Sequence, residues 1–177
     1  TQMTQELLDL SRIESGQVQL NFEMISPRKL IYSAADRMKA QVERAHLKLD
    51  VKCEDGLQNI KADKNRLEQV LVNLIHNAVK FNKPGGSITL SAEPTSGGVR
   101  CAVRDTGVGV PMESLNRIFE RFYRVDSSRT GSGTGLGLSI SKHIIEAHGG
   151  KIWAESEEGR GSTFFFIVPL DPSKAKE

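Results

Sequence analysis

Residues 63–82 read DKNRLEQVLVNLIHNAVKFN, and this stretch decides the fold. Apolar residues recur along it at helical spacing and form one continuous stripe: Leu67, Val70, Leu71, Leu74, Ile75 and Ala78. Such a stripe is typical of a helix that packs one face on a core. Asp63 predicts the N-cap, and the run KPGG at 83–86 predicts the end. We therefore expect a helix over 64–82.

Three polar residues follow the edge of that stripe. Asn73, Asn77 and Lys80 stand at i, i+4 and i+7, so they share one line of the helix beside its apolar face. Asparagine is a poor helix former, so two of them one turn apart suggest a function, although plain solvation is the competing interpretation. Amide oxygens can hold Mg²⁺ without cancelling its charge, and a lysine supplies a point charge for phosphate. The spacing suits a magnesium nucleotide.

The remaining segments predict one domain preceded by a helix. Further helices are expected over 1–15, 26–45, 111–122 and 136–148, and strands over 18–24, 47–53, 87–93, 99–104, 151–156 and 163–168. Gly16 ends the first helix, and the change to period two at Val18 places a domain boundary at 16–17. Residues 17–172 are expected to form an α+β two-layer sandwich, about three helices on a mixed, mostly antiparallel sheet of about five strands. A polar tail follows over 173–177.

Composition argues against several functional classes. The chain has 177 residues with 38% hydrophobic content, enough for one core, and a net charge of +2 without a long block of one sign. We therefore expect no nucleic-acid partner and no membrane contact. No apolar run approaches the ~20 residues that span a bilayer, so a cytoplasmic chain is expected, which leaves open a membrane anchor in a longer parent. Cys53 and Cys101 do not form a Cys-x-x-Cys pair and are expected to be core residues.

A turn rich in glycine, DTGVG, spans residues 105–109. Asp105 stands at the end of a predicted strand, and Gly107 and Gly109 would let a ligand approach the backbone closely. If that ligand is a purine nucleotide, the Asp105 carboxylate can accept a hydrogen bond from the amino group of adenine, where guanine has a carbonyl. By itself such a turn is weak evidence.

A second glycine-rich stretch, GSGTGLGL, spans residues 131–138 and directly precedes a predicted helix. Its backbone N–H groups and the positive end of the helix are suited to phosphate, and a plain flexible loop is the competing interpretation. The chain contains neither Gly-x-x-x-x-Gly-Lys-Ser/Thr nor Gly-x-Gly-x-x-Gly after a first strand. Any nucleotide would therefore be held by another geometry.

Taken in order, five motifs resemble those of sensor histidine kinases, in the ATPase superfamily that includes gyrase, heat-shock chaperone and mismatch-repair ATPases. They are an N box at 73–81 (NLIHNAVKF), a first glycine box at 105–109, an F box at 118–124 (IFERFYR), a second glycine box at 133–138 (GTGLGL) and a last glycine motif at 158–164 (EGRGSTF). The aromatic F box favours a histidine kinase over the gyrase-like and chaperone-like members. Residues 1–16 resemble the end of the second helix of the family's dimerisation hairpin.

The resemblance implies a catalytic domain that binds ATP and Mg²⁺ and transfers the γ-phosphoryl group to a histidine. The implied catalytic residues are Asn77, Lys80 and Arg124, and the implied metal ligands are Asn77 and Asn73. The implied nucleotide-binding residues are Asn73, Asn77, Lys80, Phe81, Asp105, Gly107, Gly109, Tyr123, Arg124, Gly133, Thr134, Gly135, Leu136, Gly137, Leu138 and Phe164. Residues 124–133 would be a mobile lid over the nucleotide.

In the resembled family an acidic residue directly follows the phosphate-accepting histidine. The four histidines of this chain, in order, precede Leu47, Asn77, Ile144 and Gly149. We therefore expect the acceptor on a histidine-bearing dimerisation domain of the same protein, outside this chain, and a response regulator as the downstream partner. Two alternatives stay open: a nucleotide-binding interaction module without chemistry, and a kinase that phosphorylates serine on a partner protein.

Overall fold

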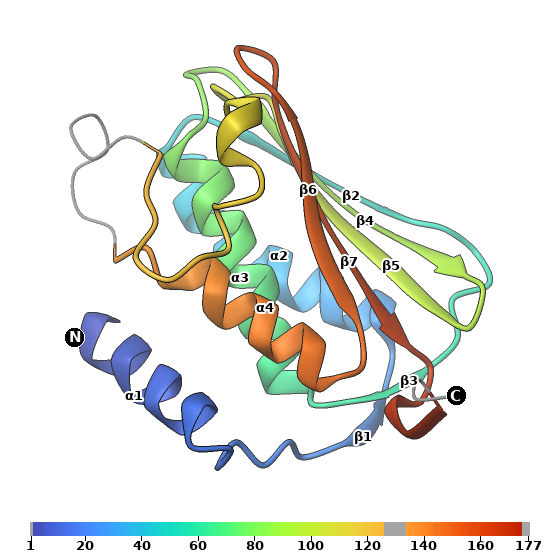
Figure 1. Ribbon diagram of the computed structural model, residues 1–177. Coiled ribbons are helices and arrows are strands. Elements are labelled where there is room, and N and C mark those ends of the chain that lie inside the picture. The colour runs from blue at the N-terminus through green and yellow to red at the C-terminus, as the bar shows by residue number, and fades with distance from the viewer. Residues whose placement is uncertain (1, 126–133, 175–177) are drawn as a thin grey trace.

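The computed structural model describes residues 2–125 and 134–174, with a layer of helices on one face of a sheet (Figure 1). The layer consists of α2 (Pro27–Arg44), α3 (Lys64–Lys80) and α4 (Gly137–Ala147). The sheet consists of β2 (Lys48–Cys53), β4 (Ser87–Thr95), β5 (Gly98–Asp105), β7 (Gly161–Pro169) and β6 (Lys151–Glu157), in this spatial order. The β2–β4 pair is parallel and the other three pairs are antiparallel. The predicted α+β class with a mixed sheet is confirmed.

Helix α3 lies in the middle of the helical layer, between α2 and α4. Its N-cap is Asp63, whose Oδ1 accepts a hydrogen bond from the backbone N of Arg66 at 3.1 Å, as predicted. The predicted apolar stripe is fully enclosed, because Leu71, Leu74 and Ile75 have 0% exposure. The helix ends at Lys80, two residues earlier than expected. The polar row Asn73, Asn77 and Lys80 lies entirely within it.

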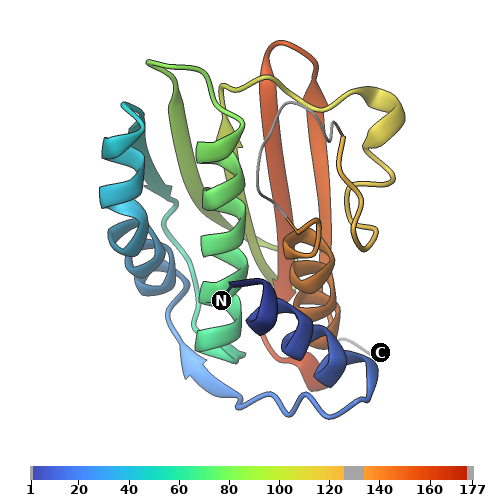
Figure 2. The ribbon, with the colours of Figure 1, turned by 90° about the vertical axis from the view of Figure 1, so that its left-hand side faces the viewer.

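Two further elements lie beside these layers. Helix α1 (Gln2–Glu14) lies across α3 and α4 on the side away from the sheet (Figure 2) and contacts α4. Strand β1 (Glu23–Ile25) pairs antiparallel with β3 (Ile60–Ala62). The predicted strand over 18–24 is therefore wrong for residues 18–22, which alternate in polarity but pair with no strand of the described part. Strand β3 was not predicted, because three residues carry too little periodicity.

The predicted helix over 111–122 is also wrong. One 3₁₀ turn, η1 (Met112–Ser114), is followed by turns up to Phe122. Phe122 has a left-handed φ of 62° and its backbone N donates to the carbonyl of Gly135 at 2.9 Å. A left-handed residue ends a helix, so no helix can continue through Phe122. Before it, the backbone bonds are mostly i→i−3 turns, such as Arg117 N to Ser114 O at 2.8 Å and Glu120 N to Arg117 O at 2.9 Å. Contact with a distant glycine therefore sets the conformation at the end of the segment.

The cysteines lie in the sheet, as predicted. Cys53 is half-buried on β2 and Cys101 is buried on β5, where burial raises the pKa of the Cys101 thiol to about 12. At the other end of the chain, η2 (Pro172–Lys174) follows the last strand, and residues 175–177 of the predicted tail lie outside the described residues. The domain limits at 16–17 and 172–173 stay predictions. Across the described residues, every helix is too short or too polar to cross a membrane.

His148 joins the end of α4 to the start of α3. Its Nε2 accepts a hydrogen bond from the backbone N of Asp63 at 3.0 Å, so Nδ1 carries the proton and donates to the carbonyl of Ile144 at 2.7 Å. The ring is buried, with the edge of Phe22 5.6 Å away between centroids. Burial lowers the pKa of His148, and the Ile144 hydrogen bond and the Asp63 charge only partly oppose this.

This lowered pKa makes the fold sensitive to acid. The unfolded chain, in which the histidine pKa is about 6.5, binds the proton more readily than the folded chain. The stability that neutral His148 contributes is therefore fully present above pH ~6.5, and it decreases as the pH falls from there towards the lower pKa of the folded state. His148→Leu is expected to cost about 1–3 kcal/mol near neutral pH, because the buried backbone N–H of Asp63 loses its acceptor. It should also flatten the acid dependence, measured by urea unfolding on both sides of pH ~6.5.

The matched control is His76→Gln, which removes a histidine that is exposed on α3. This variant should keep the wild-type acid dependence. An unchanged acid dependence in His148→Leu would show that other groups titrate in this range.

Candidate functional site

Polar side chains of α3 form one wall of the candidate site. Asn77 and Lys80 are half-buried beside the apolar stripe. Asn73 Nδ2 donates to the carbonyl of Gly137 and to Oγ of Ser141, each at 3.5 Å. The structure therefore brings Asn73, the first residue of the predicted row, against the start of α4, where the second glycine-rich stretch ends.

Lys80 lies near two other predicted site residues. Its Nζ is 5.4 Å from the centroid of the Phe81 ring, on a side chain that is 37% exposed. Burial, and to a smaller extent the charge of Arg124, lower the pKa of Lys80. Two neighbouring cations disfavour each other's charge, and a bound anion would relieve that repulsion. The Lys80–Arg124 pair is thus suited to phosphate oxygens.

The Asp105 carboxylate is fixed by two backbone donors. Its Oδ1 accepts from the backbone N of Gly107 at 2.8 Å and from that of Ser162 at 3.3 Å. The residue is 6% exposed, and burial raises the pKa of its carboxyl while these two hydrogen bonds lower it. Within the described residues Oδ2 accepts no hydrogen bond. Oδ1 therefore accepts hydrogen bonds from within the protein, and Oδ2 is the acceptor that a ligand can use.

The two glycines after Asp105 serve contacts within the protein. A Cβ on Gly107 would lie 2.2 Å from the carbonyl oxygen of Phe81, and one on Gly109 would lie 2.3 Å from that of Glu157. The backbone N of Val108, between them, donates to the Phe81 carbonyl at 3.0 Å. Glycine is required here because the turn is squeezed between the end of α3 and the β6–β7 hairpin. Approach of a ligand, the predicted reason, stays a prediction.

Sequence reasoning missed the side chains that brace this turn. Thr106 Oγ1 donates to Oδ1 of Asn82 at 3.1 Å and accepts from the backbone N of Ser87 at 2.9 Å. Ser156 Oγ, on β6, accepts from the backbone N of Val110 at 2.7 Å. Single hydroxyl and amide residues in loops and strands carry no spacing signal, so the sequence alone could not identify these contacts.

The F box and the second glycine box are joined. The Phe122–Gly135 hydrogen bond links them, and a Cβ on Gly135 would lie 2.7 Å from the carbonyl carbon of Phe122. The Tyr123 hydroxyl donates to Oγ of Ser114 at 2.9 Å, and the Arg117 guanidinium lies 4.5 Å from the Tyr123 ring centroid. Tyr123 is therefore half-buried and anchored on η1 beside the site.

The start of α4 is suited to bind an anion. Leu136 is the N-cap, and no side chain of the described residues caps the helix there. Among the described residues, the nearest atom to a Cβ on Gly137 would be Asn73 Cγ at 4.0 Å, an ordinary contact distance. Thr134 Oγ1 accepts from the backbone N of Leu136 at 3.3 Å. The first N–H groups of an 11-residue helix are thus available to a phosphate.

Three predicted nucleotide-binding residues place their side chains in the core. Leu136 is fully buried, Leu138 packs against the core, and Phe164 is buried with its ring edge-to-face on Phe119 at 6.3 Å. Any contact of these residues with a nucleotide would therefore come through the backbone. Gly133 and nearly all of the predicted lid, residues 126–133, lie outside the described residues.

Comparison with known families matches residues 62–172 to the histidine kinase-, DNA gyrase B- and HSP90-like ATPases. The chain belongs to this ATPase family. The matched segment contains the asparagine row of α3, the Asp105 turn, the F box and the start of α4. The geometry described above is therefore that of an ATPase-family domain, as the sequence resemblance implied.

Within this ATPase family, similar proteins are histidine kinases. The sensor histidine kinase WalK of Bacillus subtilis (strain 168) is 37% identical over 171 residues, which are 94% of this chain and 28% of WalK. The catalytic domain of the histidine kinase ThkA has a TM-score of 0.78 and 32% identity, covering 88% of this chain and 99% of that domain. ThkA in complex with the response regulator TrrA has a TM-score of 0.78 and 27% identity, and the match covers 98% of this chain and 49% of that chain.

Full-length ShkA in complex with AMPPNP has a TM-score of 0.85 and 32% identity over 94% of this chain and 35% of ShkA. Histidine kinase catalytic domains therefore share the fold of this chain, helices packed on a mixed five-stranded sheet. The chain spans less than a third of the length of the curated relative WalK.

Proposed function

We propose that this domain binds ATP with Mg²⁺ and transfers the γ-phosphoryl group to a histidine of a helical dimerisation domain outside the chain. The observation that carries the proposal is the convergence of three features around one end of α3. They are the amide and cation row of α3, the acceptor oxygen of Asp105 and the uncapped start of α4. Membership in an ATPase family and similarity to histidine kinases support it.

Each feature suits one part of ATP. The Oδ2 atom of Asp105 would accept a hydrogen bond from the adenine amino group, with Gly107 and Gly109 shaping the turn around it. Phe81 and Tyr123 would line the rim of the site. Lys80, Arg124 and the backbone N–H groups at the start of α4 would bind the phosphates, where charge spreads during phosphoryl transfer. The backbone of residues 133–138 and of Phe164 would complete the enclosure.

The donors on α3 fit Mg²⁺. This ion prefers oxygen ligands and takes one or two from the protein, keeping its other positions for phosphate and water. Asn77 is half-buried with a neutral amide and would be the first ligand. Asn73 would be the second through its carbonyl oxygen, since its Nδ2 already contacts α4. When bound, Mg²⁺ would neutralise phosphate charge that Lys80 and Arg124 do not cover.

The proposed acceptor histidine lies on a separate helical domain. His148 is buried and both ring nitrogens are engaged within the fold, so it cannot take the phosphoryl group without unfolding of that region. His46, His76 and His143 lack the acidic residue that follows the family's acceptor. A response regulator would receive the phosphoryl group next, a partner supported by the ThkA complex with TrrA. A cytoplasmic location would bring the domain together with ATP.

Two measurements test this function. Calorimetric titration should give tighter binding of ATP than of GTP, and Mg²⁺ should strengthen ATP binding. Adding the histidine-bearing helical domain of the same protein, with ATP and Mg²⁺, should give a phosphate bond that acid hydrolyses. An acid-stable product would indicate serine phosphorylation, and ATP binding without any transfer would indicate an interaction module.

Asn77→Ala tests the metal assignment. Loss of an outer-shell partner of a metal typically costs roughly 10- to 100-fold, and loss of a direct ligand should cost at least as much in Mg²⁺-dependent ATP affinity. The fold should persist, because Asn77 borders the apolar stripe without belonging to it. The matched control is Asn65→Ala, which removes an exposed asparagine from the first turn of the same helix. Equal ATP affinity of both variants at limiting Mg²⁺ would exclude Asn77 as a ligand.

A further inference from the structure

A row of three polar residues crosses the sheet beside the Asp105 turn (residues 105–109). Asp105 on β5 lies opposite Ser162 on β7, and Ser162 lies opposite Ser156 on β6. Directly opposite residues of neighbouring strands point to the same face of a sheet, so the three side chains line up. Ser162 is 6% exposed and Ser156 is half-buried. Asp105 is therefore one end of a polar row that is largely shielded from water.

The Ser156 hydroxyl makes three hydrogen bonds around this turn. Its Oγ accepts from the backbone N of Val110, the residue directly after the turn, at 2.7 Å. It donates to the carbonyl of Gly161 at 2.9 Å and lies 2.9 Å from Oγ of Ser162, whose hydroxyl can donate to it. A serine hydroxyl has one hydrogen to donate and two lone pairs that accept. All three are used, so this oxygen has one well-defined position.

Ser162 connects Ser156 to the carboxylate of Asp105. Its backbone N donates to Oδ1 of Asp105 at 3.3 Å, the longer of the two hydrogen bonds on that oxygen. Directly before it, a Cβ on Gly161 would lie 2.1 Å from the carbonyl oxygen of Asp105, so β7 and the start of the turn are in close contact. A residue that fixes Ser162 therefore also fixes the Asp105 carboxylate and the direction in which Oδ2 points.

The turn between β6 and β7 contacts the middle of the Asp105 turn. The backbone N of Gly159 donates to the carbonyl of Val108 at 2.7 Å, and Nζ of Lys83 donates to the carbonyl of Gly159 at 2.6 Å. These bonds align the hairpin with the middle of the turn, while Ser156 holds its two ends. One hairpin therefore restrains the Asp105 turn along its whole length.

We infer that Ser156 is a positioning residue that sets the selectivity of the proposed nucleotide site for adenine. It acts through Ser162 and Val110, which fix the two ends of the turn. A carboxylate selects adenine over guanine only when its accepting oxygen stays within hydrogen-bonding distance and angle of the amino group. A turn that shifts by about 1 Å loses most of that selectivity, whereas the phosphate-binding groups of α3 and α4 stay in place. The inference rests on the proposed function.

Ser156→Ala tests the inference, because it removes only the hydroxyl. In titration calorimetry its affinity for ATP should fall roughly 10- to 30-fold, less than the ~100-fold that a full 1 Å displacement can cost. The preference for ATP over GTP should narrow by a similar factor. Affinity for inorganic tripolyphosphate with Mg²⁺, which has no base, should stay at the wild-type value. Ser156→Thr keeps the hydroxyl and should restore both the ATP affinity and the preference for ATP.

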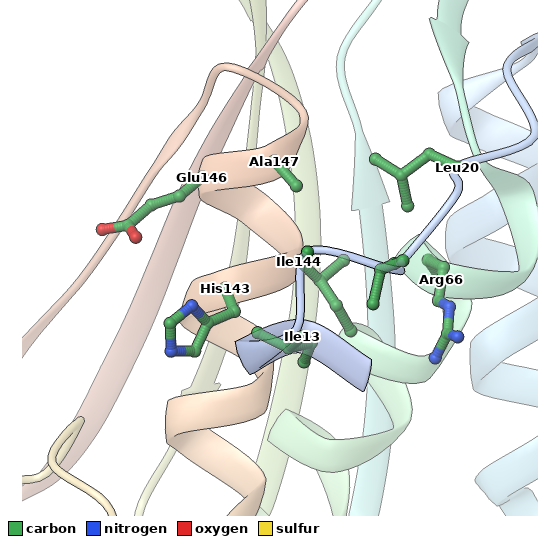
Figure 3. Close-up of a pocket in the computed structure, with 9 residues that line it drawn as sticks. Ile13, Leu20, Arg66, His143, Ile144, Glu146 and Ala147 are labelled. Carbon is green, nitrogen blue, oxygen red and sulfur yellow. The ribbon is translucent and has the colours of Figure 1, made fainter. Parts of the chain in front are cut away.

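Two controls separate positioning from a general loss of stability. Ser33→Ala removes a half-buried hydroxyl of α2, outside the proposed site, that donates to Oε1 of Glu68 at 2.9 Å. Ile144→Val enlarges a cavity of about 310 Å³ where α4 meets the chain after α1, which Ile13 and Leu20 also face (Figure 3). Both variants should lower the melting temperature and keep the wild-type affinity for ATP and preference for ATP over GTP.

The outcomes separate this inference from the proposed function. Unchanged ATP affinity in Ser156→Ala overturns the positioning role and leaves the proposed function standing. An equal loss of affinity for ATP and for tripolyphosphate does the same, because it indicates a general structural effect. A Ser156→Thr variant that binds ATP as weakly as Ser156→Ala also overturns the role of the hydroxyl. Failure of the wild-type chain to bind ATP at all overturns the proposed function as well.

Discussion

Asp105→Asn is expected to weaken ATP binding roughly 10- to 100-fold and to leave the fold intact. A hydrogen bond to a charged group contributes about 1.5–3 kcal/mol, which corresponds to this loss. The asparagine oxygen can take the place of Oδ1 and keep the Gly107 and Ser162 hydrogen bonds. Its amide nitrogen then replaces Oδ2 and cannot accept from adenine. Calorimetric titration with ATP, alongside a thermal melt, measures both quantities.

GTP provides the sharper readout for the same variant. The amide nitrogen introduced at position 105 can donate to the carbonyl of guanine, so the preference for ATP over GTP should narrow or invert. Asp105→Ala is the contrasting variant: it also orphans two buried N–H groups, each at a cost of about 1–3 kcal/mol, and should lower the melting temperature. Unchanged ATP affinity in Asp105→Asn would remove Asp105 from the adenine site.

Gly107→Ala should impair both stability and nucleotide binding. The added Cβ would lie 2.2 Å from the Phe81 carbonyl oxygen and 2.9 Å from Asp105 Oδ1, so the backbone of the turn must shift. Overpacking of this kind typically costs about 1–3 kcal/mol of unfolding free energy. A displacement of about 1 Å in the turn moves Asp105 and can cost on the order of 100-fold in a positioned interaction. Urea unfolding and ATP titration measure the two effects separately.

Gly56→Ala is the matched control for that substitution. Gly56 has a φ of +84° with nothing within 4 Å of an added Cβ, so alanine there introduces backbone strain alone. It should cost about 1–2 kcal/mol and leave ATP affinity unchanged. If Gly107→Ala binds ATP as tightly as this control, the contact between the turn and Phe81 is unimportant for the nucleotide.

The helices and strands that sequence patterns predicted well are those with long, regular periodicity. Helix α3 spans nearly five turns with one apolar stripe and an Asp63 cap, and its prediction holds to within two residues. Strand β4 alternates between buried and half-buried residues over most of its 9 residues, and β5 follows it with 8 mostly buried residues after a glycine-containing turn, which is enough to specify a hairpin. The failures, 18–22 and 111–122, are segments that contact distant partners, Asp63 for Asn21 and Gly135 for Phe122.

The sequence likewise predicted one part of the candidate site and missed another. Residue types and their spacing identified Asn77, Lys80 and Asp105, because metal and purine recognition restrict which side chains can serve. The spacing did not reveal that Leu136 and Phe164 are core residues, since an apolar residue in a loop motif looks alike whether it points inward or outward. Burial is decided by the layers packed around a residue.

The sequence by itself determined the order of the motifs, the amphipathic helix that carries the asparagine row, and the α+β class, because each is encoded in local spacing. The tertiary structure alone decided which oxygen of Asp105 serves the protein, why Gly107 must be glycine, and where α1 docks, with Glu6 accepting a hydrogen bond from the Thr134 hydroxyl. These depend on Ser162, Phe81 and Thr134, which lie 57, 26 and 128 residues away from Asp105, Gly107 and Glu6 respectively. Contacts over such separations arise only when the folded layers bring them together.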